Sequence, residues 1–402
     1  MPVLARLALA LAVFASACLS LPAHSASAAS ACLQPGSWTR LDGAAPQPGE
    51  RASVIAAQAQ RQVVLLGEQH DDPDHHLWQL QVLAALHAQR QALVLGFEMF
   101  PRRVQPILDR WVAGELSESA FLQEVQWDKV WNMPASLYLP LFHFARLNRV
   151  PMIALNVDQQ LIRQVAANGW DKVEEHEREG VGRAAAPSPE YLDFLFGIHR
   201  GHVQMRESAR ARTSRSDPRF LNFVDSQLTW DRAMAEALAR GLQQAPGADG
   251  RAPLAVGIIG SGHVRHGYGV AHQLRDLGIT DVGQLLPLAA DTPCAMLVPG
   301  LADAVFAIPA AVPEPRPPPR LGVSLLDAEG GVRVQEVSAG SLAERSELRA
   351  GDLIIEAGGQ KITRSALLAA AVRAQAPGSW LPLKLRRGDD TLELLIKFPS
   401  HP

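Results

Sequence analysis

Four short apolar runs alternate with longer amphipathic segments between residues 51 and 260, and this alternation constrains the fold more than any other feature of the chain. Apolar strands joined by helices are typical of a mostly parallel sheet that is covered on both faces. The sequence therefore predicts an α/β domain at residues 50–308, with a mostly parallel sheet flanked by helices. The runs are residues 63–66, 93–95, 151–155 and 254–259, and the helical segments are about 74–89, 102–113, 136–148, 158–168, 189–210 and 218–241.

A proline-rich segment separates this predicted domain from the rest of the chain. Residues 309–320 contain six prolines in twelve positions, a composition typical of an extended polyproline II spacer. A chain of 402 residues is long enough for two domains, and the pattern after the spacer is of β type. We therefore expect a linker at 309–320 and a small β-rich domain at 321–399.

The first 31 residues have the pattern of an export signal. Arg6 precedes an apolar run at residues 7–14, which is too short to span a bilayer stably and is typical of a signal peptide. Ala26-Ser-Ala28 suits simple cleavage, whereas Ala15-Ser-Ala-Cys18 resembles a lipobox in which Cys18 would carry the lipid. Both interpretations place the protein in the cell envelope, either periplasmic or anchored to a membrane through Cys18.

Two cysteines remain after either form of processing, Cys32 and Cys294. An even pair in an oxidising compartment favours a disulfide, and the alternative is two buried free thiols. We predict that the disulfide tethers the leading segment to the domain.

The charge balance excludes one class of partner. The chain has 38 basic and 41 acidic residues, so it lacks the overall electrostatic footprint of a nucleic-acid-binding protein. The turn Gly260-Ser-Gly262 has neither the lysine of a P-loop nor the third glycine of a dinucleotide fingerprint, which disfavours nucleotide binding as well.

Polar residues follow the ends of the predicted strands. Glu68 and His70 follow the first, Glu98 the second, Asn156 the third and His263 the fourth. In an open parallel sheet, ligands bind in the crevice beyond the carboxyl ends of the strands. We therefore expect Glu68, His70, Glu98 and His263 to meet in one functional site.

Two chemistries suit such a cluster. Its carboxylates and imidazoles are ligands for a divalent metal, and they also suit a hydrolase in which a general base activates water. His75 and His76 diverge by about 100° on a helix, so only one of them faces the site, and we favour His75. Gln227 and Asp231, at positions i and i+4 of one helix face, either are solvated or line the crevice.

Several motifs, in order along residues 50–310, together resemble the ChaN-like family of bacterial envelope proteins. That family is described as iron-regulated, haem-binding lipoproteins, and it belongs to a wider group that includes Tiki/TraB-type proteases and erythromycin esterases. The motifs are Arg61-Gln-Val-Val-Leu-Leu-Gly-Glu-Gln-His70 with His75 and His76, Gly96-Phe-Glu-Met-Phe100 with Gln105, Trp127, Ala154-Leu-Asn156, Gln227 with Asp231-Arg-Ala-Met-Ala235, and Gly260-Ser-Gly-His263 with Gly267-Tyr-Gly269.

The resemblance implies haem as the cofactor, held at the interface of a homodimer by a tyrosine ligand with a histidine contact. The chain has three tyrosines, and our first candidate is Tyr268, which closely follows the Gly260–His263 turn. The candidate histidines are His70, His75 and His263.

The C-terminal segment resembles a PDZ domain of the kind found in bacterial proteases. Residues 321–323, Leu-Gly-Val, fit the loop whose backbone N–H groups bind a C-terminal carboxylate. Residues 365–372 fit the helix beside the groove, and they include no histidine or strong charge at the start. The expected partner is a protein C-terminus with an apolar last residue, and the alternative is a PDZ fold that serves only as a structural cap.

Three functions remain open at this point. The first is an envelope haem-binding protein of haem and iron acquisition, with a PDZ module that binds protein C-termini. The second is a hydrolase, a peptidase or esterase with or without a metal, that uses the strand-end residues. The third is an adaptor whose PDZ domain recruits clients while the large domain is inert.

Overall fold

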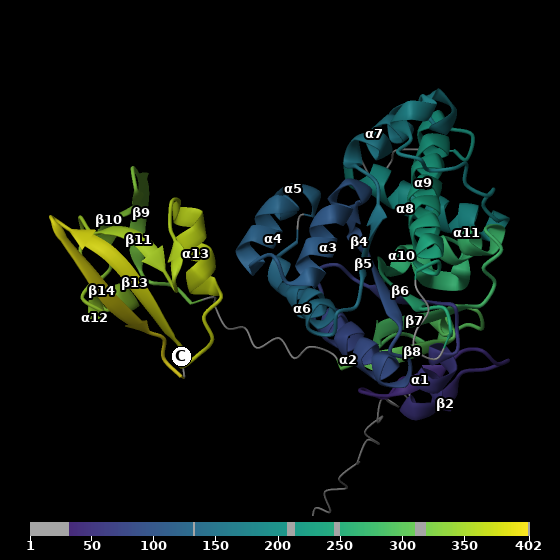
Figure 1. The fold of residues 1–402 in the computed structure, drawn as a ribbon, viewed down its shortest axis with the longest axis horizontal. Helices are drawn as coiled ribbons and strands as arrows, with labels where there is room; N and C mark the ends of the chain where they lie inside the picture. The colour runs from purple at the N-terminus through teal and green to yellow at the C-terminus, as the bar shows by residue number, and fades with distance from the viewer. Residues whose placement is uncertain (1–31, 132, 207–213, 245–249, 310–318, 401–402) are drawn as a thin grey trace, which may run out of the picture. The chain divides into compact units, whose positions relative to one another are not determined.

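The computed structural model describes residues 32–131, 133–206, 214–244, 250–309 and 319–400 (Figure 1). The chain divides into two compact units, Met1–Ala310 and Ala311–Pro402. The predicted signal peptide with Cys18, most of the predicted linker and the end of the predicted helix 189–210 lie outside the described residues. Within the described ranges, no helix has the length and hydropathy required to cross a bilayer.

An eight-stranded sheet forms the centre of the first unit, in the order β2-β1-β8-β7-β3-β6-β4-β5. The six strands from β8 to β5 are parallel, and β1 and β2 add an antiparallel edge. The strands are β1 (Trp38–Arg40), β2 (Gln47–Gly49), β3 (Val63–Glu68), β4 (Leu93–Pro101), β5 (Met152–Asn156), β6 (Leu254–Gly260), β7 (Val282–Ala289) and β8 (Ala304–Ile308).

Helices cover this sheet on both faces (Figure 1). Alternate residues of β3 belong to different cores: Val64 and Leu66 pack with α1 and α2, and Val63 and Leu65 pack with α9 and α11. Successive side chains of a strand point to opposite faces, so a strand buried on both sides is apolar throughout. The helices are α1 (Arg51–Ala59), α2 (Pro73–Gln89), α3 (Gln105–Ala113), α4 (Glu118–Glu124), α5 (Trp127–Val130), α6 (Leu139–Leu147), α7 (Gln159–Asn168), α8 (Pro189–Arg206), α9 (Pro218–Gly241), α10 (Ser261–Val264) and α11 (Val270–Asp276).

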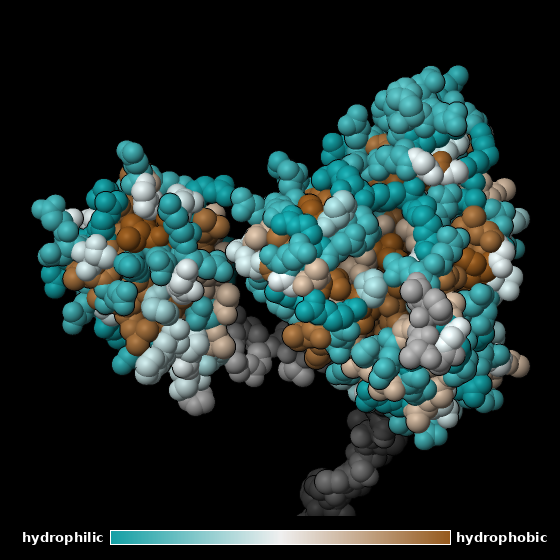
Figure 2. Space-filling view, viewed as in Figure 1, coloured by the Kyte–Doolittle hydropathy of each residue, from teal (hydrophilic) through white to brown (hydrophobic). Residues whose placement is uncertain are grey.

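The predicted fold class is confirmed. The four predicted apolar runs are β3, β4, β5 and β6, and they occupy neighbouring positions on one side of the sheet. The sequence did not predict β1, β2, β7 or β8. Figure 2 shows mainly hydrophilic residues on the visible surface of this unit, as expected for a sheet enclosed by helices.

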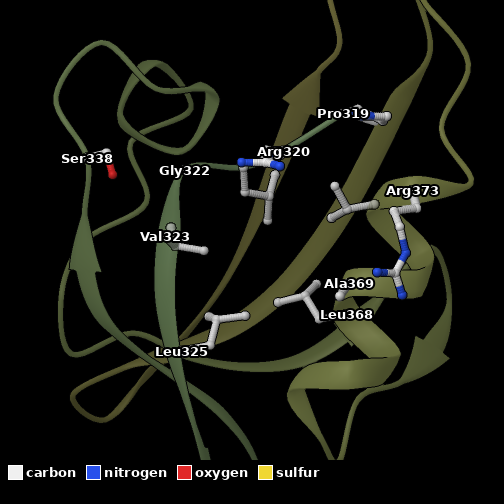
Figure 3. Close-up of a pocket in the computed structure, with 11 residues that line it drawn as sticks. Pro319, Arg320, Gly322, Val323, Leu325, Ser338, Leu368, Ala369 and Arg373 are labelled. Atoms are coloured by element: carbon white, nitrogen blue, oxygen red, sulfur yellow. The ribbon is translucent and has the colours of Figure 1, made fainter. Parts of the chain in front are cut away.

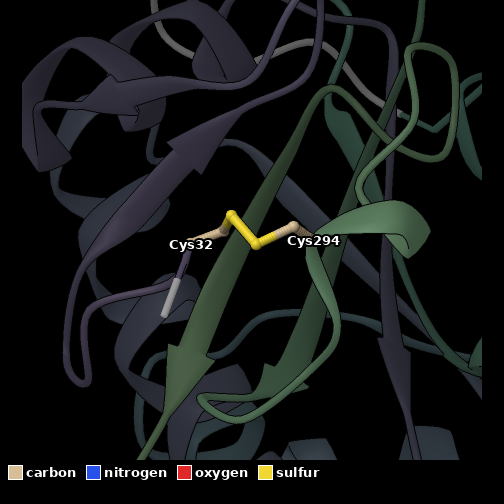
Figure 4. Close-up of a disulfide and its surroundings, with 2 residues drawn as sticks. All are labelled: Cys32 and Cys294. Carbon is tan, nitrogen blue, oxygen red and sulfur yellow. A yellow bond between two sulfur atoms is a disulfide. The ribbon is translucent and has the colours of Figure 1, made fainter. Parts of the chain in front are cut away.

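A disulfide joins Cys32 to Cys294 (Figure 4). The two Cα atoms lie 5.4 Å apart, within the usual range for a disulfide. The bond ties the segment before β1 to the connection between β7 and β8. The two cysteines are separated by 262 residues in the sequence. The bond therefore closes almost the whole first unit into one loop.

The second unit is a small antiparallel β-domain. Its strands are ordered β14-β13-β11-β10-β9, and β12 pairs with β11. Strand β9 is the last of this series, so one of its edges has no strand partner among the described residues. The elements are β9 (Val323–Ala328), β10 (Gly331–Val337), α12 (Leu342–Arg345), β11 (Leu353–Ala357), β12 (Gln360–Lys361), α13 (Ser365–Arg373), β13 (Trp380–Arg387) and β14 (Asp390–Lys397).

Candidate functional site

A pocket of about 420 Å³ lies at the carboxyl ends of the parallel strands. His70, Glu98 and His263 line it together, with Trp131 and Trp230 among its walls. Glu68 ends β3 opposite Gly260, which ends β6, and β4 lies on the other side of β6. The topology thus brings the three predicted strand ends to one place, with Glu68 buried beneath the pocket.

The first histidine of the pocket is held by a buried carboxylate. The Nδ1 atom of His70 lies 2.7 Å from Oε1 of Glu68, and the Tyr138 hydroxyl donates to the same oxygen at 3.0 Å. Tyr138 is fully buried between helices, whereas the His70 side chain is 34% exposed. The Nε2 atom of His70 is therefore the ring nitrogen that is available to a ligand in the pocket.

The second histidine is held in the same way by different residues. The Nδ1 atom of His263 lies 2.7 Å from Oδ1 of Asp231, and the Tyr191 hydroxyl donates to Oδ2 of Asp231 at 2.7 Å. Asp231 and Tyr191 are both fully buried. The first unit thus has two Tyr–carboxylate–His networks, and each of them presents its imidazole to the same pocket.

Buried carboxylates keep both imidazoles basic. Burial by itself would lower the pKa of His263, but the charge and hydrogen bond of Asp231 outweigh it and raise that pKa to about 9. Burial also opposes protonation of His70, yet Glu68 and Glu98 raise its pKa. Burial would raise the pKa of Glu68, whereas His70 and His76 lower it to about 2.

Glu98 is held in place between these two hydrogen-bond networks. Its Oε2 accepts the backbone N–H of Gly260 at 2.5 Å, and the side-chain amide of Asn156 donates to its backbone carbonyl at 2.9 Å. A Cβ atom at position 260 would lie 2.8 Å from Cε1 of His70 and 3.4 Å from Oε2 of Glu98. Glycine at this position therefore permits His70 and Glu98 to approach each other across the end of β6.

The structure differs from the prediction that His75 faces the site. The Nδ1 atom of His75 accepts the N–H of Gln69 at 2.9 Å, and its Nε2 lies 3.4 Å from Asp72, so His75 stabilises the turn that begins α2. It is His76 whose Nδ1 lies 3.2 Å from Oε2 of Glu68. His76 is buried and supports Glu68 from behind the pocket.

The predicted metal ligands Glu68, His70, Glu98 and His263 do not form a metal site. In the part of the chain that the structure describes, no group of three or more His, Cys, Asp or Glu residues is arranged to hold a metal ion. The reason lies in Glu68, which contacts both His70 and His76 and has no exposed surface. It orients imidazoles instead of facing the pocket.

A pH-dependent stability follows from the Asp231–His263 pair. Because the folded-state pKa of His263 is raised, its stabilisation is complete below about pH 6.5 and is lost as the pH rises through about 9. That shift corresponds to about 3 kcal/mol. We expect Asp231→Asn, which keeps an acceptor for Tyr191, to destabilise the first unit strongly near pH 6 and much less near pH 10.

Urea unfolding of wild type and variant at both pH values checks this. Asp276→Asn is the matched control, because Asp276 pairs with Arg232 at the surface with its side chain 46% exposed. The control is expected to change little at either pH. Equal destabilisation by Asp231→Asn at the two pH values would contradict the assignment.

The second unit has its own groove, of about 450 Å³, between β9 and α13 (Figure 3). The carbonyls of Leu321 and Gly322 accept the N–H groups of Ala343 and Ser338, each at 2.9 Å. Since a trans peptide holds C=O and N–H on opposite sides, the N–H groups of Gly322 and Val323 point the other way, into the groove. Gly322 has φ +79°, and a Cβ there would lie 2.4 Å from that of Ser341, so the loop requires glycine.

Comparison with known protein families assigns each of the two units to a family. The sequence model described as "Haem-binding uptake, Tiki superfamily, ChaN" matches residues 54–274, more than half of the chain. The chain belongs to this haem-binding family. A PDZ-domain model matches residues 319–398, so the second unit of this ChaN-family chain is a PDZ domain.

One solved structure shares the fold of the first unit. "Cofacial heme binding to ChaN of Campylobacter jejuni" matches at a TM-score of 0.50 with 16% identity, over 68% of this chain and 98% of that chain. The PDZ domain of HtrA3 bound to a phage-derived ligand is 28% identical, over 19% of this chain and 82% of that chain, at a TM-score of 0.18. A serine endoprotease from Yersinia pestis is 22% identical, over 20% and 28%, at 0.18. A comparison with curated proteins gave no match.

The tyrosines of this ChaN-family chain differ in their fitness as haem ligands. Tyr138 and Tyr191 are fully buried and donate to carboxylates, and both burial and those carboxylates raise their pKa values. A phenolate at either position would face a negative charge. Tyr268 is half-buried, and its ring stacks on that of His266 at 4.9 Å. Tyr268 is therefore the one of the three tyrosines whose hydroxyl has no carboxylate partner among the described residues.

The roles of Tyr138, Tyr191 and Asp231 were not predicted from the sequence. Asp231 was left open as solvated or crevice-lining, and the signals for it were its helical spacing from Gln227 and its place in one of the family motifs. No local pattern marks Tyr138, which lies 70 residues from Glu68. Tyr268, in contrast, does not line the strand-end pocket, but its ring lies 5.9 Å from that of Tyr191, which donates to Asp231.

Proposed function

We propose that the protein is an envelope haem-binding protein of haem and iron acquisition, in which Tyr268 is the haem ligand. The observation that carries the proposal is the family match together with Tyr268 as the one tyrosine that is neither fully buried nor bonded to a carboxylate. A phenolate is an established protein ligand to haem iron. His266, whose ring stacks on that of Tyr268, would support this ligand; burial and Arg265 lower the pKa of His266, which favours its neutral form.

The location in the envelope rests on two features of the chain. The first 31 residues have the pattern of an export signal. The disulfide between Cys32 and Cys294 suits an oxidising compartment. Acylation of Cys18, and pairing of two copies around haem, are parts of the same proposal that follow from the resemblance to envelope lipoproteins.

We further propose that the PDZ domain binds protein C-termini. The inward N–H groups of Gly322 and Val323 are placed to receive a carboxylate, and the unpaired edge of β9 can accept a peptide as an added strand. Apolar side chains from β9 and α13 line the groove, so the last residue of the ligand is apolar.

Growth on haemin as the iron source tests the physiological role. A strain that lacks this chain is expected to grow poorly under these conditions, and wild type is expected to restore growth. Two variants are each expected not to restore growth on haemin: one that lacks residues 1–31, and Tyr268→Phe. Growth on inorganic iron is expected to be unchanged in Tyr268→Phe. Equal growth of all strains on haemin would contradict a role in haem acquisition.

A second function is supported by the strand-end pocket itself, namely hydrolysis of an ester or peptide bond. The specific observation is that two imidazoles with carboxylate-bound Nδ1 atoms share a pocket with Glu98. In its neutral form His70 would take a proton from water at Nε2 as the oxygen attacks the substrate carbonyl. Protonated His263 would donate a hydrogen bond to the resulting oxyanion, and the leaving alcohol or amine would take the proton from His70.

Variants of this pocket separate a working site from a structural cluster. If the pocket is catalytic, His70→Ala and Glu98→Gln are expected to reduce hydrolysis of the best substrate in an ester and peptide screen at least tenfold while lowering stability little. Tyr268→Phe is the matched control and should leave hydrolysis unchanged. Loss of stability with every activity intact would show that the residues serve only each other.

A further inference from the structure

The PDZ groove has an apolar floor, but the charged residues of its lining are all basic. Its lining includes two arginines, Arg320 and Arg373, and no acidic residue. Neither guanidinium has a hydrogen-bond or ion-pair partner among the described residues. Both side chains are exposed at the groove (Figure 3). Among the described residues, the lining of this groove therefore has two positive charges and no negative one.

Both arginines lie at the end of the groove that receives the carboxylate. Arg320 directly precedes the loop of Leu321 to Val323. The N–H of Ser365, the first residue of α13, donates to Asp327 near the end of β9 at 2.6 Å. The helix therefore begins beside the end of β9, and its last residue, Arg373, lies at the loop end of the groove but across it from Gly322 and Val323, as Figure 3 shows.

The position of a bound peptide then follows from strand geometry. A peptide added to the edge of β9 has its last residue at the loop, and alternate side chains point to the same side. The last and third-last side chains meet the apolar floor of Val323, Leu325, Leu368 and Val372. The penultimate side chain points toward the rim. After the terminal carboxylate, this penultimate side chain is the group of the peptide nearest to the arginines.

We propose that this groove selects protein C-termini with an acidic penultimate residue followed by an apolar last residue. The inference rests on the proposed recognition of C-termini by the PDZ domain and specifies its partner. Figure 2 shows hydrophobic residues near β9 and α13 on the visible face of this unit. The apolar floor provides affinity for many C-termini, while the two arginines discriminate among them by charge.

A panel of C-terminal peptides titrated into the full chain tests this. The peptides share one apolar last residue and differ only at the penultimate position, which is Asp, Asn or Lys, and a fourth peptide is the Asp peptide with an amidated C-terminus. The Asp peptide is expected to bind about tenfold more tightly than the Lys peptide, with Asn between them. Arg373→Glu is expected to reverse this order.

Arg386→Glu is the matched control, because Arg386 is an exposed residue of β13 that does not line the groove. It makes the same charge change and should preserve the order. Equal affinity for Asp, Asn and Lys with lost affinity for the amidated peptide would overturn the charge selection alone. Equal binding of the amidated peptide, or no binding by any member of the panel, would overturn C-terminal recognition and this inference with it.

Discussion

Tyr268→Phe is expected to abolish phenolate ligation of ferric haem and to weaken haemin binding at least tenfold. Tyr268 is half-buried, and its ring stacks on that of His266, whose pKa is lowered by burial and by Arg265. Phenylalanine keeps the ring and its packing but removes the oxygen that bonds the iron. The phenolate-to-iron charge-transfer band of the haemin complex should therefore disappear, and the measurement is the visible absorption spectrum during titration.

Tyr138→Phe and Tyr191→Phe are the matched controls. Each removes one hydroxyl of the same kind from a buried position that donates to Glu68 or Asp231. Both are expected to keep the wild-type haemin spectrum. They should lower stability instead, by about 1 kcal/mol, because a buried carboxylate loses one hydrogen bond. Loss of the band in either control, with the band retained in Tyr268→Phe, would overturn the ligand assignment.

Breaking the disulfide between Cys32 and Cys294 is expected to destabilise the first unit by up to about 5 kcal/mol. The bond closes a loop of 262 residues. In the chain-entropy model, the conformational entropy that a disulfide removes from the unfolded chain grows with loop length, so a loop this long gives a large stabilisation. Thermal unfolding of wild type with and without a reductant measures the effect. The transition of the first unit should move to a markedly lower temperature on reduction.

Cys294→Ala provides the control for this experiment. Its unfolding should resemble that of the reduced wild type and should not respond to reductant. The PDZ domain has no cysteine, so its own transition is an internal reference that reduction leaves in place. Free thiols at both positions in the denatured, air-purified protein would contradict the bond.

Local patterns in the sequence were sufficient for the fold class and for the four neighbouring strands β3, β6, β4 and β5. Continuous apolar runs such as residues 63–66 and 254–259 can be accommodated only where both faces of a strand are covered, and β3 and β6 are buried throughout. Strand β7 was not predicted because Gln284 and Pro287 interrupt its apolar pattern. The edge strands β1 and β2 have three residues each, too few to give a period.

The candidate site was predictable only in part, for a physical reason. Sheet topology brings the carboxyl ends of parallel strands together, so Glu98, His70 and His263 could be grouped from sequence alone. The residues that hold them come from distant helices or turns, as Tyr138 and Asp231 do, and packing alone places these. The exchange of roles between His75 and His76 depends on one hydrogen bond from Gln69, which no periodicity reveals.

A haemin titration of the mature protein tests whether this ChaN-family chain binds haem through Tyr268, as we propose. We expect saturable binding with a defined stoichiometry, a shifted Soret band and a charge-transfer band that Tyr268→Phe removes. A Soret band that stays at the position of free haemin throughout the titration would contradict this proposal.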